Sequence, residues 1–140
     1  MSIRIFYDET DFRLKGWRKL AELLKEIIRK EEKIQGDINV IITNDEYMRK
    51  INVRFLEHDY NTDVITFNYN SGKVINGEVY ISLDTVRYNA SNYKVSLKKE
   101  IDRVVIHGVL HLVGYDDINQ DERKKMKKME DFWLGALLNS

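Results

Sequence analysis

Two histidines set four residues apart are the side chains best placed to do chemistry in this chain. His107 and His111 lie in the largely apolar stretch of residues 104–117, which reads V-V-I-H-G-V-L-H-L-V-G-Y-D-D. On a helix, residues four apart project from the same face, so both imidazoles point the same way. Paired helical histidines can converge on one metal ion, as they do in zinc hydrolases. The spacing therefore predicts a metal site.

A third ligand is expected just beyond the helix that carries the two histidines. Gly114 fits the helix end, because glycine accepts the left-handed conformation that is common there. The reversal would bring Asp116 or Asp117 back toward the histidines, with the spacing His-x3-His-x2-Gly-x2-Asp. The alternative is that each histidine is a core residue bonded to backbone. Burying either ring without a partner would cost about a few kcal/mol, so each ring needs a partner or a ligand.

Gly108, between the two histidines, predicts a close contact with the helix. A glycine inside a helix costs about 1 kcal/mol relative to alanine. It is explained if a strand or a substrate approaches the helix backbone closely, because glycine has no Cβ in the way.

The segment H-G-V-L-H-L-V-G-Y-D-D resembles the H-G-x-L-H-L-x-G-Y-D-H signature of the YbeY family of bacterial endoribonucleases, and only the last position departs. Shorter segments agree with the family in the same order along the chain. I-N-V-R-F-L-E-H-D is similar to L-N-x-x-F/Y-R-x-K-D, N-T-D-V-I-T-F to P-T-D-V-L-S-F, and G-E-V-Y-I-S to G-D-I-x-I-S. The resemblance thus covers nearly the whole chain.

The resemblance implies both a fold and an activity. The fold would be α/β (α+β): a single domain with a central four-stranded mixed sheet, about five covering helices and a buried metal-site helix. The activity would be that of a zinc-dependent, single-strand-specific endoribonuclease acting in ribosomal RNA maturation and ribosome quality control. One Zn²⁺ per chain would be held by His107, His111 and Asp117, which are then the catalytic residues. The implied partners are precursor ribosomal RNA and the small ribosomal subunit.

Two departures from the family pattern bear on the site. The family's third histidine is replaced by Asp117, whose carboxylate is an acceptable zinc ligand but lowers the net charge of the site. Asp116 and Asp121 are the alternatives as third ligand. The family's arginine is replaced by Leu56 and its lysine by His58.

Two other functions compete with the ribonuclease. The spacing also matches the extended motif of zinc peptidases, H-E-x-x-H-x-x-G-x-x-H/D, in which the glutamate is the general base. Gly108 stands at that position and cannot accept a proton, which counts strongly against proteolysis. The third reading is a non-catalytic ribosome-assembly factor whose metal site has drifted, and the substitutions at Asp117 and Leu56 both favour it.

The composition suits one globular domain over residues 1–140. Of its 140 residues, 43% are hydrophobic and 33% charged, enough for a real core. The absence of cysteine excludes disulfides and thiolate metal sites. No signal core and no apolar run of about 18 residues is present, so we expect a cytoplasmic protein with no membrane association. Lys and Arg number 23, as do Asp and Glu, so charge alone does not indicate nucleic-acid binding.

Hydrophobic periodicity and turn residues predict the elements that position the site. Strands are expected at residues 2–7, 37–43, 64–69 and 74–83, with two of them in an antiparallel hairpin. Helices are expected at residues 15–33, 45–56 and 85–93, then from Ser96 through the metal motif, and last after a capping box at residues 119–122. Gly36 is expected to break the first helix.

Three further features each have two readings. Asp63 is expected to bond its own backbone in a turn, with the wall of the active site as the alternative. Tyr88 and Tyr93, with Asn89 and Asn92, could contact single-stranded bases, but are expected to be ordinary helix surface. The basic cluster of the last helix is either an RNA-facing patch or a solvated face. It comprises Arg123, Lys124, Lys125, Lys127 and Lys128.

Overall fold

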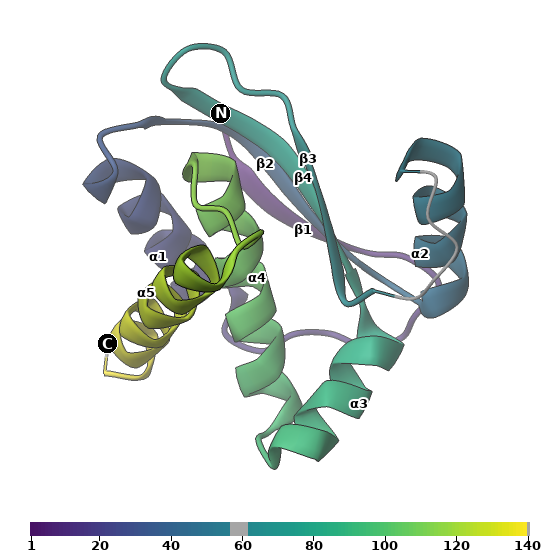
Figure 1. Cartoon of the computed structure of the whole chain (residues 1–140). Helices are drawn as coiled ribbons and strands as arrows, with labels where there is room; N and C mark the ends of the chain where they lie inside the picture. The colour runs from purple at the N-terminus through teal and green to yellow at the C-terminus, as the bar shows by residue number, and fades with distance from the viewer. Residues whose placement is uncertain (57–61, 140) are drawn as a thin grey trace.

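A four-stranded mixed sheet forms the centre of the molecule (Figure 1). The computed structural model describes residues 1–56 and 62–139. The strands lie in the order β1-β2-β4-β3, with β1, β2 and β4 parallel and β3 antiparallel to β4. The expected mixed sheet with one antiparallel pair is confirmed. The strands are β1 (Ile3–Tyr7), β2 (Ile34–Thr43), β3 (Val64–Asn68) and β4 (Val74–Ser82).

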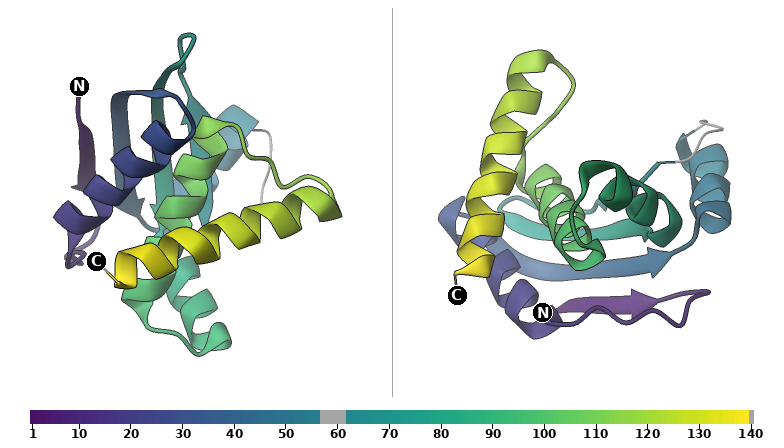
Figure 2. Two further views of the ribbon diagram at one scale, coloured as in Figure 1. Left: turned by 90° about the vertical axis from the view of Figure 1, so that its left-hand side faces the viewer. Right: turned by 90° about the horizontal axis from the view of Figure 1, so that it is seen from below.

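Helices cover both faces of the sheet (Figures 1 and 2). One face carries the main core, to which α1, α4 and α5 contribute, and the other carries a small cluster around Met48 of α2. Helix α3 follows β4 directly and packs beside α4. The helices are α1 (Trp17–Lys30), α2 (Asp45–Ile51), α3 (Leu83–Tyr93), α4 (Leu97–Val113) and α5 (Gln120–Leu138). The predicted layers and helix number are therefore confirmed.

Some predicted boundaries are wrong, and Gly36 explains one of them. This glycine lies inside β2 and does not end the first helix, which already stops at Lys30. A Cβ at Gly36 would lie 2.1 Å from Oδ1 of Asn76, so the glycine is required by the neighbouring strand. The predicted helix 45–56 also divides into α2 and the π-helical turn η1 (Asn52–Leu56).

Helix α4 is the buried centre of the fold, as expected. The Ser96 side chain caps it by accepting a hydrogen bond from the backbone N–H of Lys99, and Gly114 ends it in the left-handed conformation with φ 119°. A Cβ added to Gly108 would lie 2.6 Å from Cγ1 of Val79 on β4. The close approach predicted for Gly108 is therefore confirmed, and a strand makes it.

Helix α5 crosses α4 and begins with the predicted capping box. The Asn119 side chain accepts from the backbone N–H of Glu122, and the Glu122 side chain accepts from that of Asn119. Trp133 and Leu137 on the inner stripe are buried against the main core. Within residues 1–56 and 62–139, none of the helices combines the length and the hydropathy that a membrane crossing requires.

Candidate metal centre

The structure brings His107, His111 and Asp117 together at the end of α4. The imidazole rings lie 4.7 Å apart between centroids and are inclined at 79°. Oδ2 of Asp117 is 3.4 Å from Nε2 of His107 and 3.4 Å from Nε2 of His111. One potential ligand atom from each residue lies within 4.8 Å of the others. We call these three residues the triad.

The chain reversal after α4 places the carboxylate of the triad. The N–H of Gly114 donates to the carbonyl of His111 and that of Tyr115 to the carbonyl of Leu110, which closes the helix end. Arg123 of α5 then holds the next turn, because its Nη1 donates to the backbone carbonyls of Asp117 and Ile118 at 3.4 and 2.7 Å.

Of the three acids considered as third ligand, the structure places only Asp117 with the histidines. Asp116 lines a separate cavity beside Glu122, and Asp121 lies exposed in the first turn of α5. The ligand role of Asp117 remains a prediction, but neither alternative is within reach of both imidazoles among the described residues.

A glutamate from α5 contacts the first histidine from the side opposite the triad. Oε2 of Glu130 lies 2.5 Å from Nδ1 of His107, while the other ring nitrogen faces Asp117. Glu130 is only 8% exposed. An Nδ1–H donated to this carboxylate leaves the Nε2 lone pair directed at the triad, which is the tautomer that a metal ligand requires.

Glu130 is itself held in place by Arg103 of α4. Nη1 of Arg103 lies 3.2 Å from Oε1 of Glu130 and 2.9 Å from Oδ1 of Asp131. Each Glu130 oxygen thus has its own partner, so the carboxylate cannot rotate without losing one of them. Sequence reasoning missed both residues. Arg103 lies four before His107 on α4, but the partner on α5 could not be read from local spacing.

The charges around His107 favour its protonated form. Burial alone lowers the pKa of His107, but the hydrogen bond and charge of Glu130, with the charges of Asp117 and Asp63, outweigh burial and raise the pKa. These three carboxylates thus create a negative environment that suits a bound cation equally well.

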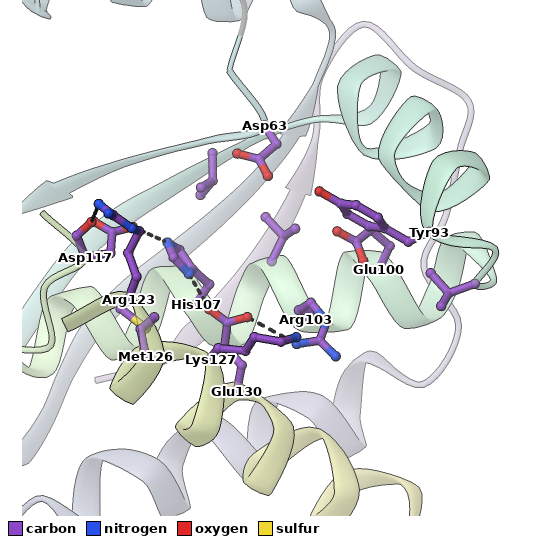
Figure 3. A pocket seen from close by; sticks show the side chains of 13 residues that line it. Asp63, Tyr93, Glu100, Arg103, His107, Asp117, Arg123, Met126, Lys127 and Glu130 are labelled. Atoms are coloured by element: carbon purple, nitrogen blue, oxygen red, sulfur yellow. Dashed lines mark hydrogen bonds and ion pairs between the residues drawn. The ribbon is translucent and has the colours of Figure 1, made fainter. Parts of the chain in front are cut away.

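The triad opens onto a cavity of about 670 Å³ (Figure 3). His107 and Asp117 line it, together with residues from α3, α4, α5 and the start of β3. The side chains of His107, His111 and Asp117 are 21%, 23% and 39% exposed. A ligand can therefore reach the triad, as a catalytic metal site requires.

Asp63 lines this cavity as well as forming the predicted turn. Its carboxylate accepts hydrogen bonds from the backbone N–H groups of Asp63 and Val64, just before β3. Burial raises its pKa, and the nearby charge of His107 partly opposes the rise. The turn role that the sequence favoured and the wall role that it left open are thus both fulfilled.

Glu100 is a further cavity residue whose place was not foreseen. It lies in the first turn of α4, is 4% exposed and lines the cavity. Burial raises its pKa, and the charge of Arg103 partly opposes that rise. The sequence did contain a signal, because Glu100 precedes His107 by seven residues and so lies on the same helical face.

The remaining predicted candidates separate into two groups. Tyr93, Arg123 and Lys127 line the cavity. Tyr88 is 67% exposed outside it, and Lys125 lies over the Tyr115 ring, 5.6 Å from its centroid. The other members of the predicted sets, Asn89, Asn92, Lys124 and Lys128, do not line this cavity.

The substitutions near residue 56 fall at the edge of the described structure. Leu56 ends η1. His58, at the position of the family's lysine, lies outside the described residues.

The donor set of the triad fits a divalent metal. Two imidazole nitrogens and one carboxylate oxygen form a combination found in catalytic zinc sites, which leave a further position for water or substrate. Because the triad has no thiolate ligand, its nitrogen and oxygen donors can also bind other divalent metals. The residues present therefore fit the metal that the predicted site requires.

Comparison with known proteins assigns the family. The model of the family described as "Endoribonuclease YbeY" matches residues 4–137. A protein of that name from Flavobacterium johnsoniae is 40% identical over 126 residues, covering 90% of this chain and 91% of the relative. Another, from Chlorobium phaeobacteroides, is 39% identical and covers 98% of both chains. A solution structure of a Thermotoga maritima protein superposes with a TM-score of 0.68 at 32% identity, covering 98% of this chain and 89% of that one. The chain belongs to the YbeY family of endoribonucleases.

Proposed function

We propose that this protein is a zinc-dependent endoribonuclease that hydrolyses single-stranded RNA and acts in ribosomal RNA maturation and ribosome quality control. The observation that carries the proposal is the convergence of His107, His111 and Asp117 at the edge of a cavity. The family supplies the nuclease class. The zinc, the single-strand preference and the ribosomal substrate are the parts that we propose.

The three triad residues would hold the zinc ion. When bound, zinc supplies a Lewis acid and lowers the pKa of a bound water to about 7. Hydrolysis joins the oxygen of water to phosphorus and breaks one phosphorus–oxygen bond of the RNA backbone. The proton from water ends on the ribose oxygen that leaves.

The protein's own residues prepare the site for that reaction. Glu130 accepts the hydrogen at Nδ1 of His107 and so directs Nε2 of that ring toward the triad. Arg123 and Lys127 place two cations on the cavity lining, where they attract the phosphates on either side of the scissile bond. The positive charges of these two residues offset the negative charge that Asp117 brings to the triad.

The competing functions are less well supported. A zinc peptidase needs a general base at the position of Gly108, but that residue packs against Val79 and has no side chain. A non-catalytic assembly factor has no need for ligand atoms from three residues to stay within 4.8 Å of one another. The intact triad therefore favours the enzyme.

Metal content tests the proposal first. Protein purified without chelators is expected to carry about one zinc per chain by plasma mass spectrometry, and the Asp117→Ala variant is expected to lose most of it. Asp116→Ala is the matched control, since Asp116 lies in a separate cavity. Absence of zinc from the wild type, even after zinc is added, would refute the zinc enzyme. If Asp117→Ala retains as much zinc as the control variant Asp116→Ala, Asp117 is not a ligand.

Activity and the ribosomal partner are tested next. The wild type is expected to cleave single-stranded RNA within the strand and to leave a duplex of the same sequence intact, while His107→Ala is inactive. We also expect the protein to co-sediment with small ribosomal subunits. Equal cleavage by the wild type and His107→Ala would indicate a contaminating nuclease and overturn the proposed activity.

A further inference from the structure

The end of the cavity away from Asp117 is lined by an aromatic ring, a carboxyl group and an apolar side chain. Tyr93, at the last position of α3, and Glu100, in the first turn of α4, line it together with Val95 between the two helices. Figure 3 shows Tyr93 and Glu100 at this end, with His107 between them and Asp117. None of these three residues belongs to the triad or to its contacts with Glu130.

Glu100 is a largely buried residue whose carboxyl group accepts no hydrogen bond from the described residues. The residue is only 4% exposed, and no described residue donates a hydrogen bond to its side chain, although the charge of Arg103 acts on it. Burying a polar group without a partner is unfavourable unless a ligand or water supplies one. Because Glu100 lines the cavity, a ligand bound there can supply the missing donor.

Tyr93 offers an aromatic surface beside this carboxyl group. The residue is 64% exposed at the end of α3, so its ring contributes little to the core. Exposed aromatic rings on a nucleic-acid path stack on bases of any sequence. A flat aromatic ligand with N–H donors at its edge would therefore match both side chains.

The position of Glu100 relative to the triad decides which part of an RNA chain it meets. Glu100 precedes His107 by seven residues, which places it about 10 Å farther along the α4 axis. A hydrogen bond spans about 3 Å, so Glu100 cannot contact a phosphate that lies at the triad. A nucleobase attached next to that phosphate can extend along the cavity to this distance.

We propose that Tyr93 and Glu100 form a nucleobase subsite, in which the tyrosine ring stacks on one base of the RNA strand and the glutamate binds the edge of that base. The subsite rests on the proposed function, because it assumes an RNA strand at the triad. Each of the four bases carries at least one N–H donor on its pairing edge, and a carboxyl group retains an acceptor oxygen in either protonation state. The subsite would select single strands, because a paired base has no free edge.

Binding of short oligoribonucleotides tests the subsite. Fluorescence anisotropy is measured with labelled adenine, cytosine and uracil homopolymers and with an abasic strand of equal length and charge. The protein is used both as purified and after zinc removal, which prevents cleavage during the titration. The variants are Tyr93→Ala, Glu100→Gln and, as matched control, Tyr88→Ala, which removes another exposed tyrosine of α3 that does not line the cavity.

The expected results differ between the variants. The wild type binds base-bearing strands more tightly than the abasic strand, and Tyr93→Ala weakens their binding about tenfold while leaving the abasic strand unchanged. Tyr88→Ala binds as the wild type does. Glu100→Gln keeps the side-chain volume but presents a fixed amide, so the order of preference among the three bases changes.

Two results would overturn the subsite, and they differ in what they say about function. If the wild type binds RNA but Tyr93→Ala and Glu100→Gln retain its affinities and base preference, the subsite is wrong and the nuclease proposal stands. If the wild type binds no strand and cleaves none, the proposed function fails and the subsite fails with it.

Discussion

Nδ1 of His107 on α4 lies 2.5 Å from Oε2 of Glu130 on α5, while Nε2 of the same ring faces Asp117. The two ring nitrogens of one histidine are therefore divided between a buried carboxylate and the triad. Helix α5 thus determines the orientation of a residue that α4 presents. We expect this contact to control metal affinity.

Replacing Glu130 tests that relationship. Glu130→Gln preserves the shape and an acceptor oxygen but removes the negative charge, so His107 becomes a poorer ligand. Zinc affinity, measured by competition with a chromophoric chelator, is expected to fall about 10- to 100-fold. Asp131→Asn is the control, because Asp131 also pairs with Arg103 but does not contact the histidine. Unchanged zinc affinity in Glu130→Gln would show that the contact is only structural.

Gly108 and Gly135 form a matched pair for testing the packing of α4 on the sheet. An alanine Cβ at Gly108 would lie 2.6 Å from Cγ1 of Val79, whereas at Gly135 of α5 it would meet no atom of the described residues within 4 Å. Both changes gain about 1 kcal/mol of helix propensity. Overpacking, at about 1–3 kcal/mol, is expected to reverse that gain at Gly108 only.

Urea denaturation measures the difference between the two glycine variants. Gly135→Ala should raise the free energy of unfolding, and Gly108→Ala should lower it by about 1 kcal/mol. If Gly108→Ala is as stabilising as Gly135→Ala, the contact between α4 and β4 is looser than the structure indicates.

Asp102 makes the stability of the protein depend on pH. Its side chain is 4% exposed and its Oδ2 pairs with Nζ of Lys98 at 2.8 Å, but Oδ1 has no hydrogen-bond partner among the described residues. Burial raises the pKa of Asp102 above 3.8, and the bond and charge of Lys98 only partly oppose the rise. The folded state therefore keeps the proton to higher pH than the unfolded state does.

The sign of the effect follows from proton linkage. As pH rises from about 3.8 through the raised pKa, the unfolded state binds fewer protons than the folded state, so Asp102 lowers the free energy of unfolding. Asp102→Asn cannot ionise. The stability of this variant relative to the wild type should rise across that pH window and then level off, as measured by urea denaturation at a series of pH values. A pH-independent difference would contradict the raised pKa.

The basic residues of α5 that line the cavity are expected to contribute to RNA binding, and those outside it are not. Arg123 and Lys127 line the cavity, whereas Lys124 and Lys128 do not. Alanine at Arg123 or Lys127 is expected to weaken RNA binding. Each change should also reduce the slope of the logarithm of the binding constant against the logarithm of salt concentration by about one, the value for one lost phosphate contact. Alanine at Lys124 or Lys128 should change neither. Anisotropy titrations at several salt concentrations measure both quantities, and equal losses at all four positions would indicate a diffuse electrostatic effect.

Local sequence determined the arrangement of the triad. His107 and His111 share a face because of helical periodicity, and Gly114 permits the turn that returns Asp117 to them. All of this geometry lies within eleven residues. The capping box at Asn119 was predictable for the same reason, since each of its bonds joins residues three apart.

Only the tertiary structure decided what surrounds the triad. Glu130 meets His107 because α5 crosses α4, and Asp63 reaches the cavity because β3 begins beside that helix. These contacts join residues far apart in the chain, so no local pattern encodes them. Tyr93 and Tyr88 show the same limit, because both are exposed tyrosines of one helix and only the packing of α3 beside α4 separates a cavity residue from a surface residue.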